Sequence, residues 1–169
     1  MSPRVSDGRL VLFADLLTTH SQLTQILDMQ LEEQADLSLT WFQALLALSQ
    51  ADGHALPMAE LAAHVNLSAP GTTRLVDRLA DAGLVERERR ADDARIYVAT
   101  LTNLGIEKLN AAIDLHIDGI DEHLMHRLSR SEKWLLDRVL AKLSGRTEEH
   151  KPSVLVEAAR ARREGRADT

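Results

Sequence analysis

Apolar side chains recur every three to four residues along most of the chain, a spacing typical of amphipathic helices. The first such segment covers residues 8–34, with its pattern carried by Leu12, Leu16, Leu23, Ile26, Leu27 and Leu31. The same spacing predicts further helices at residues 40–50, 58–65, 68–82, 103–128 and 129–144. A short basic helix is also expected at Pro152–Arg163. The pattern therefore predicts a mainly helical chain.

Residues that cap or break helices set these boundaries. Thr40 and Gln43 have the spacing of a capping box and are expected to open the second helix. Pro57 falls where the first turn of a helix accepts proline, and Ser68 is a favourable N-cap for the fourth helix. Further caps are predicted at Gly83, Thr102, Ser129 with Glu132, and Gly145.

The pattern changes between residues 84 and 101. Leu84–Arg90 and Ile96–Leu101 alternate and hold strand-forming residues, and the polar turn Ala91–Ala94 separates them, so this segment is predicted to be a β-hairpin. Three helices followed by a hairpin is the order of a winged helix-turn-helix, in which one helix braces another that enters the major groove of DNA. The fold class expected is thus mainly α with a small β-hairpin wing.

The helix 68–82 has one apolar and one polar side. Thr72, Leu75, Val76 and Leu79 are expected to face the core. Arg74 and Arg78 stand four residues apart on the other side and project together, and arginine suits both guanine edges and phosphates. The alternative is an ordinary solvated helix face with Arg/Asp pairs.

The hairpin carries a second group of arginines: Arg87, Arg89, Arg90 and Arg95. A protruding basic loop suits the narrow, electronegative minor groove. Asp93 stands two residues before Arg95 and could hold its guanidinium outward. A salt-bridged, exposed hairpin tip is the alternative.

Several stretches of this region resemble the multiple antibiotic resistance regulator (MarR) family: Thr73-Arg74-Leu75-Val76-Asp77-Arg78-Leu79, Gly83-Leu84-Val85-Glu86-Arg87, Asp93-Ala94-Arg95 and Leu101-Thr102. The plan of long helices before and after the winged domain is similar over residues 10–144. The wing motif of that family is usually Asp-Arg-Arg, and here Ala94 stands at its middle position. The substitution removes one further backbone contact and keeps the outer pair.

The resemblance implies a set of DNA contacts. Ser68, Thr73, Arg74 and Arg78 would be major-groove and phosphate contacts, and Arg95, held by Asp93, would enter the minor groove. Arg89 and Arg90 belong to the same basic wing. The family also implies a small aromatic or anionic effector bound between the dimer helices and the winged domain. His20, Trp41, Phe42 and His64 are the expected lining residues, although each could equally be core.

The long flanking helices carry more apolar surface than a winged domain can cover, and exposed patches of that size mark interfaces. Residues 8–36 and 103–144 are therefore expected to be dimerisation helices, around a DNA-binding domain at 39–102 and before a tail at 145–169. A two-fold dimer would read a palindromic operator. The alternative is that these helices pack on each other within one monomer.

Charge and composition narrow the function further. The 169 residues carry a net charge of −6, but residues 66–101 hold six arginines against six acidic residues and no lysine. The balance also permits a winged helix used for protein interaction without specific DNA binding. The chain has no cysteine, which excludes thiol-based sensing, and it shows no export signal or membrane span. A cytoplasmic location is expected.

Enzyme and metal chemistry find little support. No nucleophile–base pair or phosphate loop is present, so no enzyme and no cofactor are expected. His116, His123 and His126 fall on the predicted fifth helix, but a single helix supplies an incomplete ligand set, and surface or interface histidines are the favoured interpretation. The sequence thus predicts a homodimeric transcriptional regulator, most simply a repressor, that binds double-stranded DNA.

Overall fold

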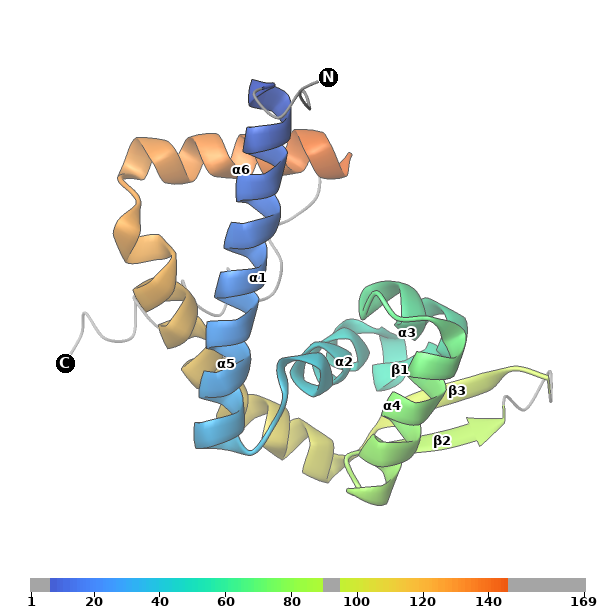
Figure 1. The fold of residues 1–169 in the computed structure, drawn as a ribbon. Helices are drawn as coiled ribbons and strands as arrows, with labels where there is room; N and C mark the ends of the chain where they lie inside the picture. The colour runs from blue at the N-terminus through green and yellow to red at the C-terminus, as the bar shows by residue number, and fades with distance from the viewer. Residues whose placement is uncertain (1–6, 90–94, 146–169) are drawn as a thin grey trace.

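The computed structural model describes residues 7–89 and 95–145, which form six α-helices and a small sheet (Figure 1). The hairpin turn Ala91–Ala94 and the predicted basic helix Pro152–Arg163 lie outside these residues. The elements, in chain order, are α1 (Gly8–Ala35), α2 (Leu39–Gln50), η1 (Asp52–His54), β1 (Ala55–Pro57), α3 (Met58–His64), α4 (Ala69–Asp81), β2 (Val85–Arg89), β3 (Tyr97–Leu101), α5 (Asn103–His123), η2 (Met125–Arg127) and α6 (Arg130–Ser144).

The three strands form one antiparallel sheet in the order β1-β3-β2. Strands β2 and β3 pair from Val85↔Leu101 to Arg89↔Tyr97, which confirms the predicted hairpin. Strand β1 was not predicted, because three residues including a proline give no alternating pattern. It pairs with β3 on the sheet edge, where Pro57 needs no ladder hydrogen bond. Pro57 is accordingly the N-cap of α3 and not a residue of its first turn, which corrects the expectation.

Helix α2 lies at the centre of the core. Phe42, Leu45 and Leu48 are almost fully buried, and they belong to one cluster with Leu61 of α3 and Leu79 of α4. The sheet closes this lobe through Val85 and Ala99. The lobe formed by α2, α3, α4 and the sheet stands beside the packed pair α1 and α5 (Figure 1).

Helix α2 starts earlier than the capping-box spacing predicted. Ser38, not Thr40, is the N-cap, and its hydroxyl accepts a hydrogen bond from the Trp41 N–H at 3.3 Å. The Leu39 N–H donates to the Asp28 carboxylate of α1 at 2.7 Å. A tertiary contact thus satisfies a backbone donor at the helix start, and that contact cannot be read from local spacing.

Helix α5 ends at His123, five residues before the predicted end. Leu124 leaves the helical conformation, with φ −124° and ψ −59°, and the short turn η2 follows. Apolar residues continue at helical spacing through this bend, which is why the periodicity predicted one helix. The capping box of Ser129 and Glu132 then opens α6 as predicted.

Helix α6 has no buried residue among those described. Most of the N-terminal half of α1 is likewise exposed. No helix of the described residues is long and apolar enough to span a membrane.

Candidate nucleic-acid interface

Helix α4 is fixed in the lobe by one buried side. Thr72, Leu75, Val76 and Leu79 are buried, as the pattern predicted. Ser68 caps the helix from an extended conformation, and its hydroxyl accepts a hydrogen bond from the Gly71 N–H at 3.4 Å. At the other end Gly83 has φ +72°, the left-handed conformation expected of a residue that ends a helix.

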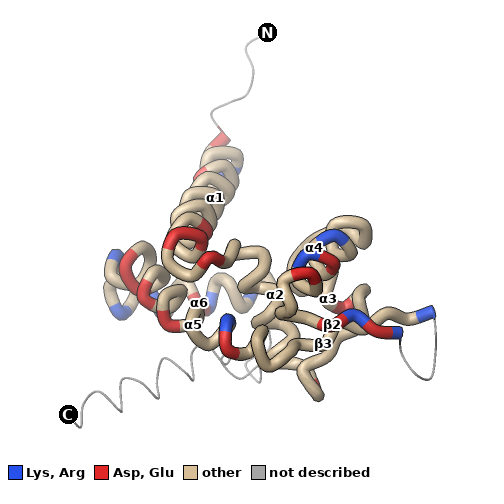
Figure 2. Tube along the Cα trace, turned by 90° about the horizontal axis from the view of Figure 1, so that it is seen from below, with Lys and Arg blue, Asp and Glu red and all other residues tan. Residues whose placement is uncertain are grey.

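The opposite side of α4 faces outward. Arg74 and Arg78 are exposed, as is Ser68 at the N-cap. Thr73 is half-buried, and its hydroxyl donates to the Ala69 carbonyl at 3.0 Å, which leaves the oxygen able to accept. Basic positions thus occur on α4 and again along the hairpin, interleaved with acidic ones (Figure 2).

The wing stands against one flank of α4. Arg87 of β2 donates from Nη1 to Asp77 Oδ1 of α4 at 2.9 Å. Arg89, at the end of β2, and Arg95, two residues before β3, are both exposed. Arg90 and Asp93 lie outside the described residues, as does the expected contact of Asp93 with Arg95.

Tyr97 is the residue of this region that sequence reasoning missed. It stands opposite Arg89 in the hairpin, and its hydroxyl accepts a hydrogen bond from Arg89 Nε at 3.1 Å. Its ring also lies beneath the Arg87 guanidinium, with 4.3 Å from Cζ to the ring centroid. Strand alternation places Arg87, Arg89 and Tyr97 on one face, but only the hairpin register shows which of them meet.

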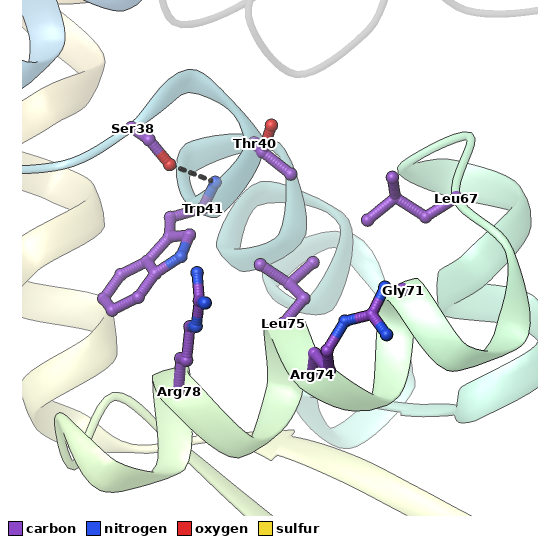
Figure 3. A pocket seen from close by; sticks show the side chains of 8 residues that line it. All are labelled: Ser38, Thr40, Trp41, Leu67, Gly71, Arg74, Leu75 and Arg78. Atoms are coloured by element: carbon purple, nitrogen blue, oxygen red, sulfur yellow. Dashed lines mark hydrogen bonds between the residues drawn. The ribbon is translucent and has the colours of Figure 1, made fainter.

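The other flank of α4 borders a pocket of about 310 Å³ (Figure 3). Its lining combines the N-terminal end of α2 with the start and outer flank of α4: Ser38, Thr40, Trp41, Leu67, Gly71, Arg74, Leu75 and Arg78. The Trp41 ring and the two guanidinium groups border the same opening (Figure 3). An aromatic face with two cations nearby is chemically suited to a flat organic anion.

The four residues expected to line an effector cleft are not brought together. Trp41 lines the pocket, whereas Phe42 is buried in the core, with its ring centroid 4.5 Å from that of His116. His20 is exposed on α1, and His64 is exposed at the end of α3.

The histidines considered for metal binding are also separated. His116 is buried in α5 and His123 is half-buried at its end, whereas His126 is exposed and belongs to η2. Placing all three on one helix was therefore wrong. Within residues 7–89 and 95–145, no three His, Cys, Asp or Glu side chains are grouped so that they could hold a metal ion.

Two further helices, α1 and α6, expose large apolar side chains. Those of α1 include Leu10, Val11, Leu12, Phe13, Leu16 and Leu17. Those of α6 are Trp134, Leu135, Val139, Leu140 and Leu143. Such an accumulation on a single chain indicates a surface that another molecule covers.

Comparison with known proteins agrees with this geometry. Residues 35–96 match the model of the MarR family. The chain is 29% identical over 120 residues to the transcriptional repressor MprA of Escherichia coli K12. The matched segment covers 70% of this chain and 68% of MprA.

Two regulators from Streptomyces coelicolor have the same fold. AbsC, a MarR family transcriptional regulator, superposes with a TM-score of 0.76 at 24% identity over 85% of this chain and 97% of its own. Sco3205, a MarR family regulator solved in complex with DNA, gives a TM-score of 0.76 at 25% identity over 90% of this chain and 94% of its own.

Proposed function

The chain belongs to the MarR family of transcriptional regulators, and from this premise we propose that it is a repressor that binds a palindromic operator as a homodimer. The family is one of regulators and not of enzymes. The observation that carries the proposal is the arrangement of α4, whose exposed Arg74 and Arg78 stand beside an arginine-bearing wing. The similarity to a regulator solved in complex with DNA supports DNA binding by this chain. A protein with this role acts where the DNA lies, in the cytoplasm.

The contacts divide by groove. Arg74, near the middle of the outer face of α4, would read a base in the major groove, since a bidentate arginine is the commonest specific contact to guanine. Ser68, Thr73, Arg78 and Arg89 would bind phosphates, which fix register without reading sequence. Arg95, before β3, would enter the minor groove. Arg90 and Asp93 belong to the same proposed wing.

The exposed apolar faces of α1 and α6 support the dimer. A monomer would leave these side chains in water, whereas a two-fold partner would cover them with the same surface of its own. We assign residues 8–36 and 103–144 to this interface and residues 39–102 to DNA binding. Two reading heads related by the two-fold axis require a palindromic site.

The pocket beside α4 supports ligand responsiveness. Arg74 and Arg78 line it and are also proposed DNA contacts. A small aromatic anion held between these guanidinium groups and Trp41 would therefore compete with DNA for the same charges. Binding of such an effector would release the operator.

DNA titrations of single variants test this function. The DNA would be an operator selected by the purified protein from a random duplex library, with an unselected duplex for comparison. Arg74→Ala is expected to cost about 1–3 kcal/mol on the operator and less on the unselected duplex. Arg95→Ala is expected to weaken both and to lower the salt dependence, because one positive charge that displaces condensed counterions from the DNA is lost. A second arm adds benzoate, which should weaken operator binding by the wild type.

Arg130→Ala is the control, since Arg130 is an exposed arginine in the polar first turn of α6 and belongs to neither α4 nor the wing. Equal loss on both duplexes would make Arg74 a phosphate contact. DNA affinity that does not change with salt, or survives Arg95→Ala unchanged, would favour a protein-interaction module.

A further inference from the structure

Two arginines of strand β2 share one face of the wing but have different surroundings. Arg87 is mostly covered, with 27% of its side chain exposed, and it pairs with Asp77 of α4. Its Nε is buried without a hydrogen-bond partner among the described residues. Arg89, two residues further along the strand, is exposed. Arg87 thus points into the joint between wing and helix, and Arg89 lies beyond it.

Tyr97 contacts both guanidinium groups. The Arg87 Cζ lies 4.3 Å and the Arg89 Cζ 5.4 Å from the centroid of its ring, both within the range of cation–π attraction. The Tyr97 hydroxyl in addition accepts the hydrogen bond from Arg89 Nε at 3.1 Å. The ring therefore holds Arg87 against Asp77, and the hydroxyl holds Arg89.

We propose that Tyr97 is a positioning residue for DNA binding, which presets the Arg89 guanidinium for a phosphate while Arg87 braces the wing against α4. The inference rests on the proposed function. It adds Tyr97 as the residue that directs Arg89 toward a phosphate and Arg87 toward α4. The hydrogen bond to Tyr97 uses Nε of Arg89 and leaves its two terminal amino groups to bind phosphate oxygens. A long side chain held in one orientation before binding loses less conformational entropy when it binds.

The hydroxyl is the part of Tyr97 that can be removed alone. Tyr97→Phe keeps the ring beneath Arg87 and deletes the acceptor for Arg89. It is expected to weaken binding to an unselected duplex at low salt by about threefold, in line with the entropy cost of ordering one long side chain on binding. In an Arg89→Ala background the same substitution should have no further effect, because the side chain that it positions is gone.

Arg89→Ala alone should lower the salt dependence by about 0.9 per wing, the contribution of one phosphate contact. Tyr97→Phe should leave that dependence close to wild type, because the contact is weakened and not lost. Thermal melting of each variant checks that the lobe stays folded. A purely structural role for Tyr97 would instead lower the melting temperature and weaken binding equally in both backgrounds, which would overturn the proposal.

An NMR measurement without DNA separates this inference from the proposed function. In the wild type the Arg89 Nε–H proton should exchange with water more slowly than in Tyr97→Phe, with the exposed Arg130 of α6 as the internal reference. Equal exchange of the Arg89 proton in the two proteins would overturn the positioning role, whatever the DNA result. Slow exchange in a protein that binds no duplex would confirm the positioning of Arg89 and refute DNA binding, and with it the role that we assign.

Discussion

At the scale of single residues, His116 is a titratable side chain buried among the apolar residues of the core. Only 8% of it is exposed, its ring packs against Phe42, and its Nδ1 has no hydrogen-bond partner in the described part of the chain. Burial lowers the pKa of His116 below its ordinary value of 6.5, because the charged imidazolium loses hydration there. The folded protein therefore holds a neutral imidazole between α5 and α2.

This burial predicts acid sensitivity. Between pH 6.5 and the lowered pKa of the folded state, His116 is protonated in the unfolded chain and neutral in the folded chain. The unfolded state therefore binds more protons, and the free energy of unfolding decreases as the pH is lowered. The loss attributable to this residue has a slope of at most about 1.4 kcal/mol per pH unit and ends at the lowered pKa of the folded state. His116→Gln should lose less stability than the wild type between pH 7.5 and 5.5 in urea unfolding. The exposed His126→Gln is the control, and an unchanged pH dependence in His116→Gln would refute the assignment.

Residue roles could be predicted from sequence where spacing alone decides them. The buried side of α4 followed from the positions of Thr72 and Leu79, since a helix has one period. Trp41 and Phe42 show the limit. They are neighbours about 100° apart around α2, so one enters the core and the other borders a pocket, and only the packing of α4 decides which. Tyr97 was missed because its partners come from another strand.

At the scale of elements, helices and the hairpin were predictable, and their ends less so. The spacing of Thr40 with Gln43 predicted the start of α2, but the N-cap is Ser38, and the Leu39 N–H donates to the Asp28 carboxylate beside it. Strand β1 exists only because β3 supplies a partner. These features depend on segments distant in sequence, so local patterns do not contain them.

The joint between the winged lobe and α5 is one such feature. Thr102, the N-cap of α5, donates from its hydroxyl to the Gly83 carbonyl at 2.7 Å, and its N–H donates to the Leu84 carbonyl at 3.1 Å. Gly105 lies in the first turn of α5, directly against Leu84, which precedes β2, and Leu101 of β3. A Cβ at Gly105 would overlap the Leu84 carbonyl oxygen and lie 2.8 Å from Leu101 Cδ1.

Gly105→Ala is therefore expected to lower the free energy of unfolding by about 2–3 kcal/mol, the cost of overpacking against atoms that cannot yield easily. The favourable helix propensity of alanine would offset only about 1 kcal/mol. Gly8→Ala is the matched control, because no atom lies within 4 Å of a Cβ there and the change should stay under about 1 kcal/mol. Urea unfolding measures both, and equal stability of the two variants would show that the joint is not tightly packed.

At the scale of the whole molecule, the distribution of apolar surface supports the proposed dimer. The winged lobe buries most of its large apolar side chains, whereas α6 has no buried residue and exposes five large apolar side chains. Leucine and tryptophan side chains that stay in water contribute no burial free energy. A helix that remained without a partner would therefore gain nothing from this apolar composition. The exposed face of α6 supports the proposed assignment of residues 103–144 to an interface, which the excess of apolar positions in the sequence also suggests.

A charge placed on this face should prevent assembly. Leu140 of α6 is 45% exposed in the single chain, and a two-fold dimer would bury it twice. Leu140→Asp would leave an unpaired carboxylate at each copy, at a cost of several kcal/mol, so sedimentation velocity at about micromolar concentration should show a monomer. Ser131→Asp adds the same charge at an exposed polar position in the first turn of α6 and should leave the dimer intact.

Circular dichroism should show that the winged lobe remains folded in Leu140→Asp, and operator affinity should fall toward that of one reading head. A wild-type protein that sediments as a monomer would remove both the dimer and the argument for a palindromic site.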